Sequence, residues 1–524
     1  MAIDLPALAD LPDRLRALCD LSVVETRELA GRHEYDGVVQ DLSVSAVNSG
    51  LARLGRGPDP ADAFDAARLR VAEHAVHVQL GVVADHRRNP MWHLSGLDLA
   101  CYDREYAPEA QRAASRLRHL EAWPAAVDVA VTTLDQVASP VASALLGPAR
   151  GLAADLTDTP LAAELRSAIG GEARLDAALA AHQRLVAHLE AAERNGPPDA
   201  AYGADHLAQL LGAPEALEVD LGTLAATSDT ERSRLRGILA EACDRLEPGS
   251  TAAELVPRLL ADHPSEPEQI YAEAREQIAE ATAFTLERGL LPDYGGECRV
   301  GPAPASRRWA MAMMSWAAPY EPDAPSWYHV TPPDEQWSTE AREEWLAVFS
   351  RTTLPGITVH EVTPGHFSHG RALRELTSDV RRLFQSVAFI EGWAHYAEEL
   401  FVEEGFRAGD PRFAIGMCVE ALIRVTRLAV SVGVHTGAFD VEEGARRFEA
   451  DAFQRGPAAR AEAVRATFDP TYGRYTWGKL VIQGVRDQAR EQWGAGYSHL
   501  RLHQALLGLG APPLGLIEEA LRLG

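Results

Sequence analysis

Apolar residues recur at helical spacing along most of the chain. A stripe with i, i+7, i+11, i+14 spacing is made by Leu69, Val76, Leu80 and Val83, and a similar one by Leu175, Leu179, Val186 and Leu189. This spacing places apolar side chains on one face of a helix, and the abundant Ala between them has high helix propensity. The pattern predicts two amphipathic helices whose apolar faces contact the core.

A long helix is predicted after residue 265. Ser265 and Glu268 have the spacing of a capping box, and Pro267 is compatible with the first turn of a helix. The helical pattern runs to about Arg288, where Gly289 is well suited to end the helix as its C-cap.

The character of the chain changes between residues 299 and 333. Pro and Gly there separate short runs rich in aromatic and β-branched residues, such as Ser326-Trp327-Tyr328-His329-Val330. We expect a small β element here, whose edge would align a bound peptide as an added strand. Helical patterns resume at Ser338, so the prediction is a mainly α protein, with an N-terminal helical half at residues 1–296 and a C-terminal half at 297–524.

Composition and charge exclude several classes of function. The chain has 524 residues, 46% of them apolar, and a net charge of -26. Such a charge repels nucleic acids and anionic membranes, so neither is expected as a partner. The five cysteines are spread singly, which is typical of reduced thiols. The acidic start MAIDLPALADLPDRL is unlike a signal peptide, no window is long and apolar enough for a membrane span, and we predict a soluble, cytoplasmic protein.

One segment has the residue types of a metal site. His360-Glu361 is followed by Pro364-Gly365-His366, whereas the zincin signature HExxH places two zinc ligands at i and i+4 with a general base beside the first. The i+6 spacing of His360 and His366 turns the second side chain by about 240° on an ideal helix. From the spacing alone, structural histidines remain an open alternative, as does His369 as the second ligand.

Pro364 indicates how His366 could return to the face of His360. Proline interrupts a helix and disfavours helical geometry in the preceding residue. Gly365 can adopt backbone angles that are closed to other residues. A two-residue excursion at Pro364-Gly365 would therefore bring His366 back to the metal side.

A second run places three side chains that can bind metal on one helical face. Glu391, His395 and Glu398 are spaced i, i+4, i+7, and Glu391 follows His366 by enough residues for a loop and a returning helix. Glu391 is the expected third ligand, with His395 as an alternative ligand. Glu398 or Glu399 would hold the far nitrogen of a ligand histidine.

These two motifs resemble those of a bacterial family catalogued as domain of unknown function 885. The resemblance includes residues 360–366 and 391–398, the helix end Arg427 to His435, and the turn Pro470 to Tyr475, and so spans about residues 327–488. Residue 369, where members often have Gln, and the turn near Tyr472 depart from the family pattern.

That family is similar in outline to the helical gluzincin peptidases, which include angiotensin-converting enzyme. The resemblance implies a two-halved helical shell around a deep cleft with zinc on its floor. It implies that His360, His366 and Glu391 are ligands and that Glu361 is the base. It also implies that His435 and Tyr475, or Tyr472 in its place, bind the carbonyl oxygen of the substrate.

The expected function is a zinc-dependent hydrolase, a peptidase acting on short peptides or other amides, with one Zn²⁺ per chain. Mn or Fe would also suit these ligands. Two alternatives remain open: a metal enzyme acting on a non-peptide amide or ester, and a non-catalytic binding protein with a relict site. From the residues alone, His435 could instead cap a helix end, Tyr472 and Tyr475 could be packing residues, and Arg427 could pair with an acid or bind a substrate carboxylate.

Overall fold

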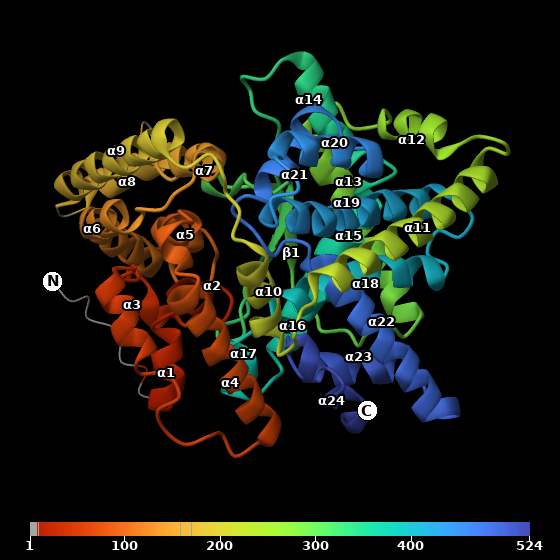
Figure 1. Cartoon of the computed structure of the whole chain (residues 1–524), viewed down its shortest axis with the longest axis horizontal. Coiled ribbons are helices and arrows are strands. Elements are labelled where there is room, and N and C mark those ends of the chain that lie inside the picture. Colours follow the sequence, from red (N-terminus) through yellow and green to blue (C-terminus); the bar gives the residue numbers. More distant parts are fainter. Residues whose placement is uncertain (1–7, 9, 158, 169) are drawn as a thin grey trace.

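The computed structural model describes residue 8 and residues 10–157, 159–168 and 170–524. The chain is mainly helical with one small sheet, which confirms the prediction of a mainly α protein with a small β element (Figure 1). The two-halved shell around a deep cleft stays a prediction. Part of the acidic N-terminal segment used above to predict the absence of a signal peptide lies outside these residues. In the part that the structure describes, no helix has the length and apolar character needed to cross a bilayer.

The helices before the sheet are α1 (Asp13–Cys19), α2 (Val23–Glu28), α3 (Val44–Leu51), α4 (Ala63–Val76), α5 (Met91–Leu97), α6 (Glu109–Thr133), α7 (Ser139–Gly151), α8 (Pro160–Ser167), α9 (Gly171–Asn195), α10 (Ala204–Gly212), α11 (Leu221–Leu246), α12 (Ala252–Leu260) and α13 (Pro267–Glu287). The helices after it are α14 (Thr339–Leu346), α15 (Leu354–Glu361), α16 (His366–Leu373), α17 (Asp379–Leu383), α18 (Val387–Glu403), α19 (Arg412–His435), α20 (Val441–Ala452), α21 (Gly456–Arg465), α22 (Arg474–Trp493), α23 (His499–Gly508) and α24 (Glu519–Leu523).

Both apolar stripes lie on helices, as predicted. The first belongs to α4, to the π-helical turn His77–Val82 that continues it and to the C-cap Val83, and its four residues are buried. In the second stripe, on α9, Leu175 and Leu189 are fully buried and Leu179 and Val186 are partly buried. α9 packs on α6 and α7 around Trp123, which forms a helical layer at the upper left of Figure 1.

The start of α13 is displaced by one residue from the prediction. Its N-cap is Glu266, and Pro267 occupies the first helical position, where its missing N–H is not needed. The amide of Ser265 accordingly donates to the side chain of Gln269 at 3.3 Å. The predicted end is confirmed, because Gly289 follows the helix with φ +60°, in the left-handed region.

The predicted β element is a three-stranded sheet of β1 (Cys298–Pro302), β2 (Ala312–Ser315) and β3 (Ser326–Val330) in the order β1-β3-β2. β3 pairs parallel with β1, Cys298 opposite Ser326, and antiparallel with β2, Ala312 opposite Val330. Because β3 is the central strand, both of its edges are already paired. The expectation that residues 326–330 align a peptide as an edge strand is therefore wrong.

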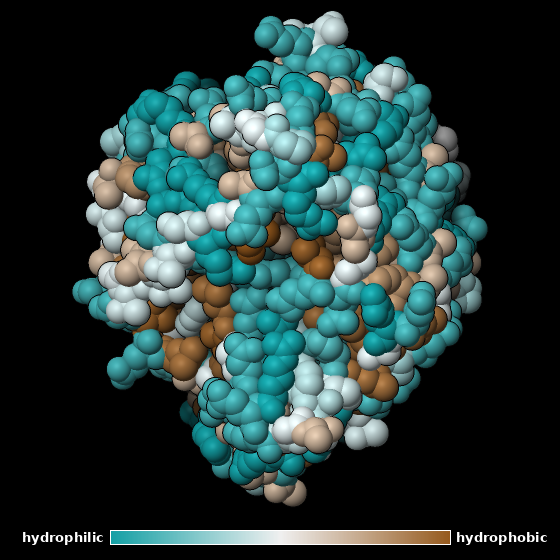
Figure 2. All heavy atoms as spheres, turned by 90° about the vertical axis from the view of Figure 1, so that its right-hand side faces the viewer, coloured by the Kyte–Doolittle hydropathy of each residue, from teal (hydrophilic) through white to brown (hydrophobic). Residues whose placement is uncertain are grey.

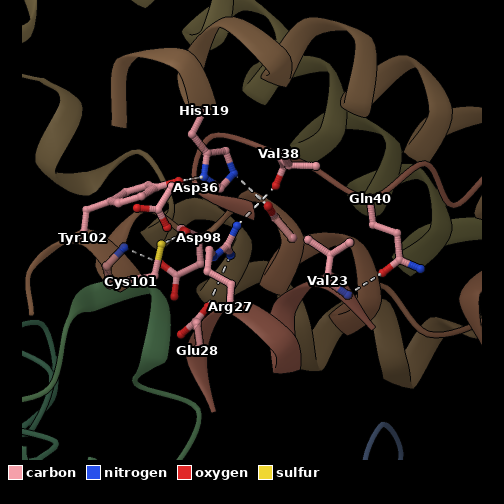
Figure 3. Close-up of polar contacts among 12 residues, drawn as sticks. Val23, Arg27, Glu28, Asp36, Val38, Gln40, Asp98, Cys101, Tyr102 and His119 are labelled. Atoms are coloured by element: carbon pink, nitrogen blue, oxygen red, sulfur yellow. Dashed lines mark hydrogen bonds and ion pairs between the residues drawn. The ribbon is translucent and has the colours of Figure 1, made fainter. Parts of the chain in front are cut away.

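A buried polar network lies inside the N-terminal helices (Figure 3). Arg27 donates to the carbonyl oxygen of Val38 at 3.2 Å and pairs with Glu28. Nearby, the Nδ1 atom of His119 lies 2.9 Å from the Tyr102 hydroxyl, and its Nε2 atom lies 2.8 Å from the carbonyl oxygen of Gly96. These two contacts require one acceptor and one donor on the His119 ring, and a neutral imidazole has one of each.

Ion pairs connect these helices to the segment around the sheet. Arg307 pairs with both Glu28 and Asp98 at 2.6 Å, and Arg104 pairs with Glu321 at 2.7 Å. Farther along the chain, α11 packs along α19, and α13 packs on β1 and α15. The division of the chain at residue 296 stays a prediction.

Close packing of α18 on α22 forms the centre of the C-terminal part. A Cβ atom on Gly392 would lie 2.5 Å from the backbone carbon of Gly478, so the two backbones touch. Next to this contact, the fully buried Lys479 pairs with Glu231 of α11 and with Glu399 of α18. On the face of the molecule in Figure 2, hydrophobic residues are interspersed among a majority of hydrophilic ones.

Candidate metal centre

The structure brings His360, His366 and Glu391 together. The Oε2 atom of Glu391 lies 3.5 Å from Nε2 of His360 and 3.3 Å from Nε2 of His366, and one donor atom from each residue lies within 4.8 Å of the others. Both imidazoles are buried, with exposed side-chain fractions of 4% and 8%. Three protein donors at such separations can surround a single cation.

The break between α15 and α16 positions His366. The amide of Ser368 donates to the carbonyl oxygen of Val362, six residues earlier, instead of the usual four. The chain thus contains the two extra residues predicted for this point. Gly365 has φ −70° and ψ −133°, outside the regions that other residues usually occupy, as predicted. A Cβ atom there would also lie 1.8 Å from the carbonyl oxygen of His360.

Glu391 lies in the second turn of α18. Ser386 begins this helix as its N-cap, accepting a hydrogen bond from the amide of Phe389. Burial disfavours the charged form of Glu391, but the nearby imidazoles of His366 and His360 outweigh it and hold the pKa of this carboxyl well below its ordinary value. An ionised carboxylate is the form that binds a metal.

The far nitrogen of His360 is held by a carboxylate, as predicted. Its Nδ1 atom lies 2.6 Å from Oε1 of Glu398, which also pairs with Arg424 at 3.2 Å. The Nδ1 atom of His395 lies 3.5 Å from the other oxygen of Glu398, and burial lowers the pKa of His395 to about 4. The side chain of His395 therefore contacts the supporting carboxylate, and His395 is not part of the group formed by His360, His366 and Glu391.

Glu361 and His360 line a cavity of about 70 Å³ beside the three metal-site residues. Glu361 is buried, and its Oε2 atom has no hydrogen-bond partner within the described ranges. Burial is the main cause that raises the pKa of this carboxyl, to about 7. A buried carboxylate with a free oxygen beside a metal site is placed to exchange a proton with a bound water.

Tyr475 and three arginines line the same cavity. The ring of Tyr475 stacks on that of His360, with centroids 6.2 Å apart, and its hydroxyl accepts a hydrogen bond from Arg465 at 3.3 Å. Arg427 makes two hydrogen bonds to Glu462, at 2.6 and 2.7 Å, and lies over the Tyr475 ring. Arg427 therefore pairs with an acid, one of the two roles considered for it.

The structure does not bring His435, Tyr472 or His369 to this cavity. The Nε2 atom of His435 lies 2.9 Å from the carbonyl oxygen of Ala466, and its ring packs against Tyr202. Tyr472 is fully buried in the core beneath α19, and His369 lies 3.3 Å from the carbonyl oxygen of Gly510.

Sequence reasoning missed Arg424 and Glu420, which line the cavity from α19. These two residues pair with each other at 3.1 Å, and Arg424 also contacts Glu398. A signal was present, because Glu420, Arg424 and Arg427 follow i, i+4, i+7 spacing inside a helix whose other residues are mostly apolar. Charges on one face of a buried helix need partners or a polar cavity.

The family model described as "Bacterial protein of unknown function (DUF885)" matches residues 25–521. The chain belongs to this family. The resemblance seen at about residues 327–488 therefore extends over nearly the whole chain, including the helices before the sheet.

Two solved structures have the same fold. One, described as a putative lipoprotein of unknown function from Shewanella oneidensis, is 21% identical, with a TM-score of 0.75 and 98% of each chain covered. The other, described as a putative lipoprotein from Colwellia psychrerythraea, is 16% identical, with a TM-score of 0.76, and the match covers 98% of this chain and 96% of that one. No curated protein matches the chain. Since both neighbours are described as lipoproteins, the comparisons do not support the predicted cytoplasmic location.

The residues present fit a zinc ion. Zinc accepts two histidine nitrogens and a carboxylate oxygen at bonds of about 2.0–2.2 Å, which in a tetrahedron separates the ligand atoms by about 3.3–3.6 Å. The Glu391–histidine distances of 3.3 and 3.5 Å fall in this range. The Oε2 atom of Glu391 also has no hydrogen-bond partner among the described residues, although it is buried.

Proposed function

We propose that this protein is a zinc-dependent hydrolase, a peptidase that acts on short peptides. The observation that carries the proposal is the buried group of His360, His366 and Glu391 with Glu361 beside it on a cavity. Two histidines and a carboxylate leave a fourth position open for water or substrate, which is typical of catalytic zinc sites.

Each residue at the site has a role that follows from its position. His360, His366 and Glu391 would hold the ion, and Glu398 would orient His360 through its Nδ1 atom. When bound, zinc would lower the pKa of a water molecule and polarise a substrate carbonyl. Glu361 would take the proton of the attacking water on its free oxygen and later pass it to the leaving amine.

Tyr475 is the candidate donor to the carbonyl oxygen of the substrate. Its hydroxyl accepts from the guanidinium of Arg465, which leaves its own proton available. Removal of a donor to such an oxygen typically slows the chemical step about 100- to 1000-fold. His435 and Tyr472 take no part in the proposed mechanism, because neither lines the cavity.

Metal analysis of the purified protein beside a His366→Ala variant tests the metal site. We expect about one zinc per chain in the wild type and a large loss in the variant, since His366 supplies one of three ligands. No stoichiometric metal in the wild type, even after zinc is added back, would contradict the proposal.

A mixed peptide library, followed by mass spectrometry, tests the activity. Glu361→Gln is the control, because it retains the metal ligands and loses the base. Cleavage by the wild type alone is the expected result. Cleavage of amide or ester substrates other than peptides would favour the alternative metal enzyme, and zinc binding without any cleavage would favour a binding protein with a relict site.

A further inference from the structure

A second cavity, of about 220 Å³, lies between the N-terminal helices and the first turns of α18 and α22. Its lining is mostly apolar and includes Val76 and Trp92 from the N-terminal helices and Phe384, Val387 and Trp477 from later in the chain. The helices that contribute to its lining include α2, α4, α5, α10, α17, α18 and α22, which meet near the middle of the molecule (Figure 1). An apolar cavity of about 150 Å³ holds a benzene molecule, so this one has room for a large side chain.

The cavity adjoins the candidate metal centre. Val387 and Ala388 line it, and Glu391 lies one turn farther along the same helix. At about 100° per residue, Glu391 projects at an angle between those of Val387 and Ala388, and it lies about 4.5 Å beyond Ala388 along the axis. Arg474 lines the cavity too, and the next residue, Tyr475, stacks on His360.

Of the four charged side chains that line the cavity within the described residues, three have partners. Arg68 donates to the carbonyl oxygens of Phe384 and Ala511, and Arg474 pairs with Asp469 at 3.1 Å. Glu215 accepts from the Ser386 hydroxyl at 2.8 Å and from the amide of Leu514 at 2.9 Å.

The fourth, Glu25, has no ion-pair partner within the part of the chain that the structure describes. It lies in the first turn of α2 and keeps an exposed side chain. Burial by the surrounding protein nevertheless raises its pKa, with Glu28 and Arg27 acting in opposite directions. A carboxylate that solvent can reach, although protein atoms surround it, lies on the wall of a recess. Gln385 lines the same cavity, and its buried Oε1 atom also lacks a partner among the described residues.

We propose that this cavity is a subsite for the N-terminal residue of a peptide. The ammonium group of that residue would bind Glu25, with the Oε1 atom of Gln385 as a second acceptor, and its apolar side chain would fill the rest of the cavity. An ammonium has three donors and no acceptor, which suits a carboxylate without an ion-pair partner and an amide oxygen without a hydrogen bond among the described residues. The role as a subsite of an enzyme rests on the proposed function, whereas the binding itself does not.

Calorimetric titration with L-phenylalanine amide tests the binding without any turnover. The protein carries Glu361→Gln throughout, and each titration is made on zinc-loaded and on chelator-treated samples. We expect the additional change Glu25→Gln to weaken binding at least about 10-fold, the typical cost of a lost hydrogen bond to a charged group. Glu109→Gln, which removes an exposed acid from the first turn of α6, is the matched control and should leave the affinity unchanged.

Two further measurements separate the ammonium from the side chain. N-acetyl-L-phenylalanine amide lacks the cation and should bind at least about 10-fold more weakly to the parent protein, with no further loss from Glu25→Gln. Val387→Trp changes an exposed residue on the cavity wall. It should weaken the binding of L-phenylalanine amide, because the larger side chain would fill the cavity.

Equal binding of the free and acetylated amides, or an unchanged affinity in Glu25→Gln, would overturn the proposal. Tight, Glu25-dependent binding of Nα-acetyl-L-lysine amide would also overturn it, because the cation would then belong to a side chain. These outcomes do not depend on catalysis. If the chain holds no zinc and cleaves nothing, the titrations still test the cavity, and if they fail while peptides are cleaved, the proposed function stands without this subsite.

Discussion

The Nδ1 atom of His360 lies 2.6 Å from Oε1 of Glu398, and Glu398 is in turn held by Arg424 at 3.2 Å. Burial disfavours the charge on Glu398, but Arg424, His395 and His360 outweigh it and lower the pKa of this carboxyl far below its ordinary value. A carboxylate fixed in this way keeps the proton of His360 on Nδ1. The Nε2 atom, which faces Glu391, is then free to donate its lone pair to a metal.

Glu398→Gln should weaken zinc binding about 10- to 100-fold, the usual effect of losing a carboxylate that supports a ligand histidine. The affinity is measured by competition with a chelating dye. Glu403→Gln, on the same helix and paired with Arg486 instead of a ligand, should bind zinc as the wild type does. Equal affinities of the wild type and Glu398→Gln would show that this contact does not support a metal ligand.

Gly365→Ala should abolish the metal site. The new Cβ atom would lie 1.8 Å from the carbonyl oxygen of His360 and 2.5 Å from that of Val359, so the break between α15 and α16 must shift and His366 with it. We expect loss of zinc in metal analysis and a lower midpoint of thermal unfolding.

Gly409→Ala is the matched control for this change, because a Cβ atom there would have no neighbour within 4 Å. It should retain both zinc and stability. A Gly365→Ala protein with a full complement of zinc would contradict the account of the break.

Lys479→Met should lower the free energy of unfolding by about 3–5 kcal/mol, the typical cost of removing one partner from a buried ion pair. The methionine has a similar length, but among the described residues it leaves the buried Glu231 and Glu399 with Arg234 as their one remaining ion-pair partner. Urea unfolding followed by circular dichroism gives the measurement. Arg490→Met, at a more exposed position of α22, should change the free energy of unfolding by less than about 1 kcal/mol.

The parts of the fold that sequence could predict are those with local causes. The stripes on α4 and α9 and the C-cap at Gly289 follow from spacing and backbone preference over a few residues. The same holds for the break at Pro364-Gly365. Which strand of the small sheet is central depends on contacts between distant segments, and the expectation of a free edge at residues 326–330 was therefore wrong.

The candidate site shows the same division. The sequence could predict that His360, His366 and Glu391 lie together, because each belongs to a motif whose spacing indicates its role. His435 and Tyr475 could not be told apart in this way, since their positions depend on how α19 and α22 cross the cavity. The structure places Tyr475 against His360 and turns His435 toward Ala466.

The stability of the protein should fall as the pH drops below about 6.5, and His119 should account for a measurable part of the fall. Burial, assisted by the charge of Arg27, lowers the pKa of His119 to about 3, whereas an unfolded histidine titrates near 6.5. At a pH between these two pKa values, His119 therefore binds a proton in the unfolded chain but not in the folded chain. The stabilisation is complete above about pH 6.5 and is lost progressively toward pH 3. Between pH 7 and pH 5, one such histidine contributes about 2 kcal/mol of the decline.

Urea unfolding of chelator-treated protein at pH 7 and pH 5 measures this decline. Other buried histidines, such as His93 and His503, also contribute to it. In His119→Gln, the amide can replace the donor to Gly96, and the decline should be smaller by about 2 kcal/mol. His74→Gln, at an exposed position of α4, should leave the decline unchanged. If His119→Gln loses as much stability as the wild type over this range, the folded protein accepts the proton, and the hydrogen bonds of Figure 3 must rearrange to hold a charged imidazole.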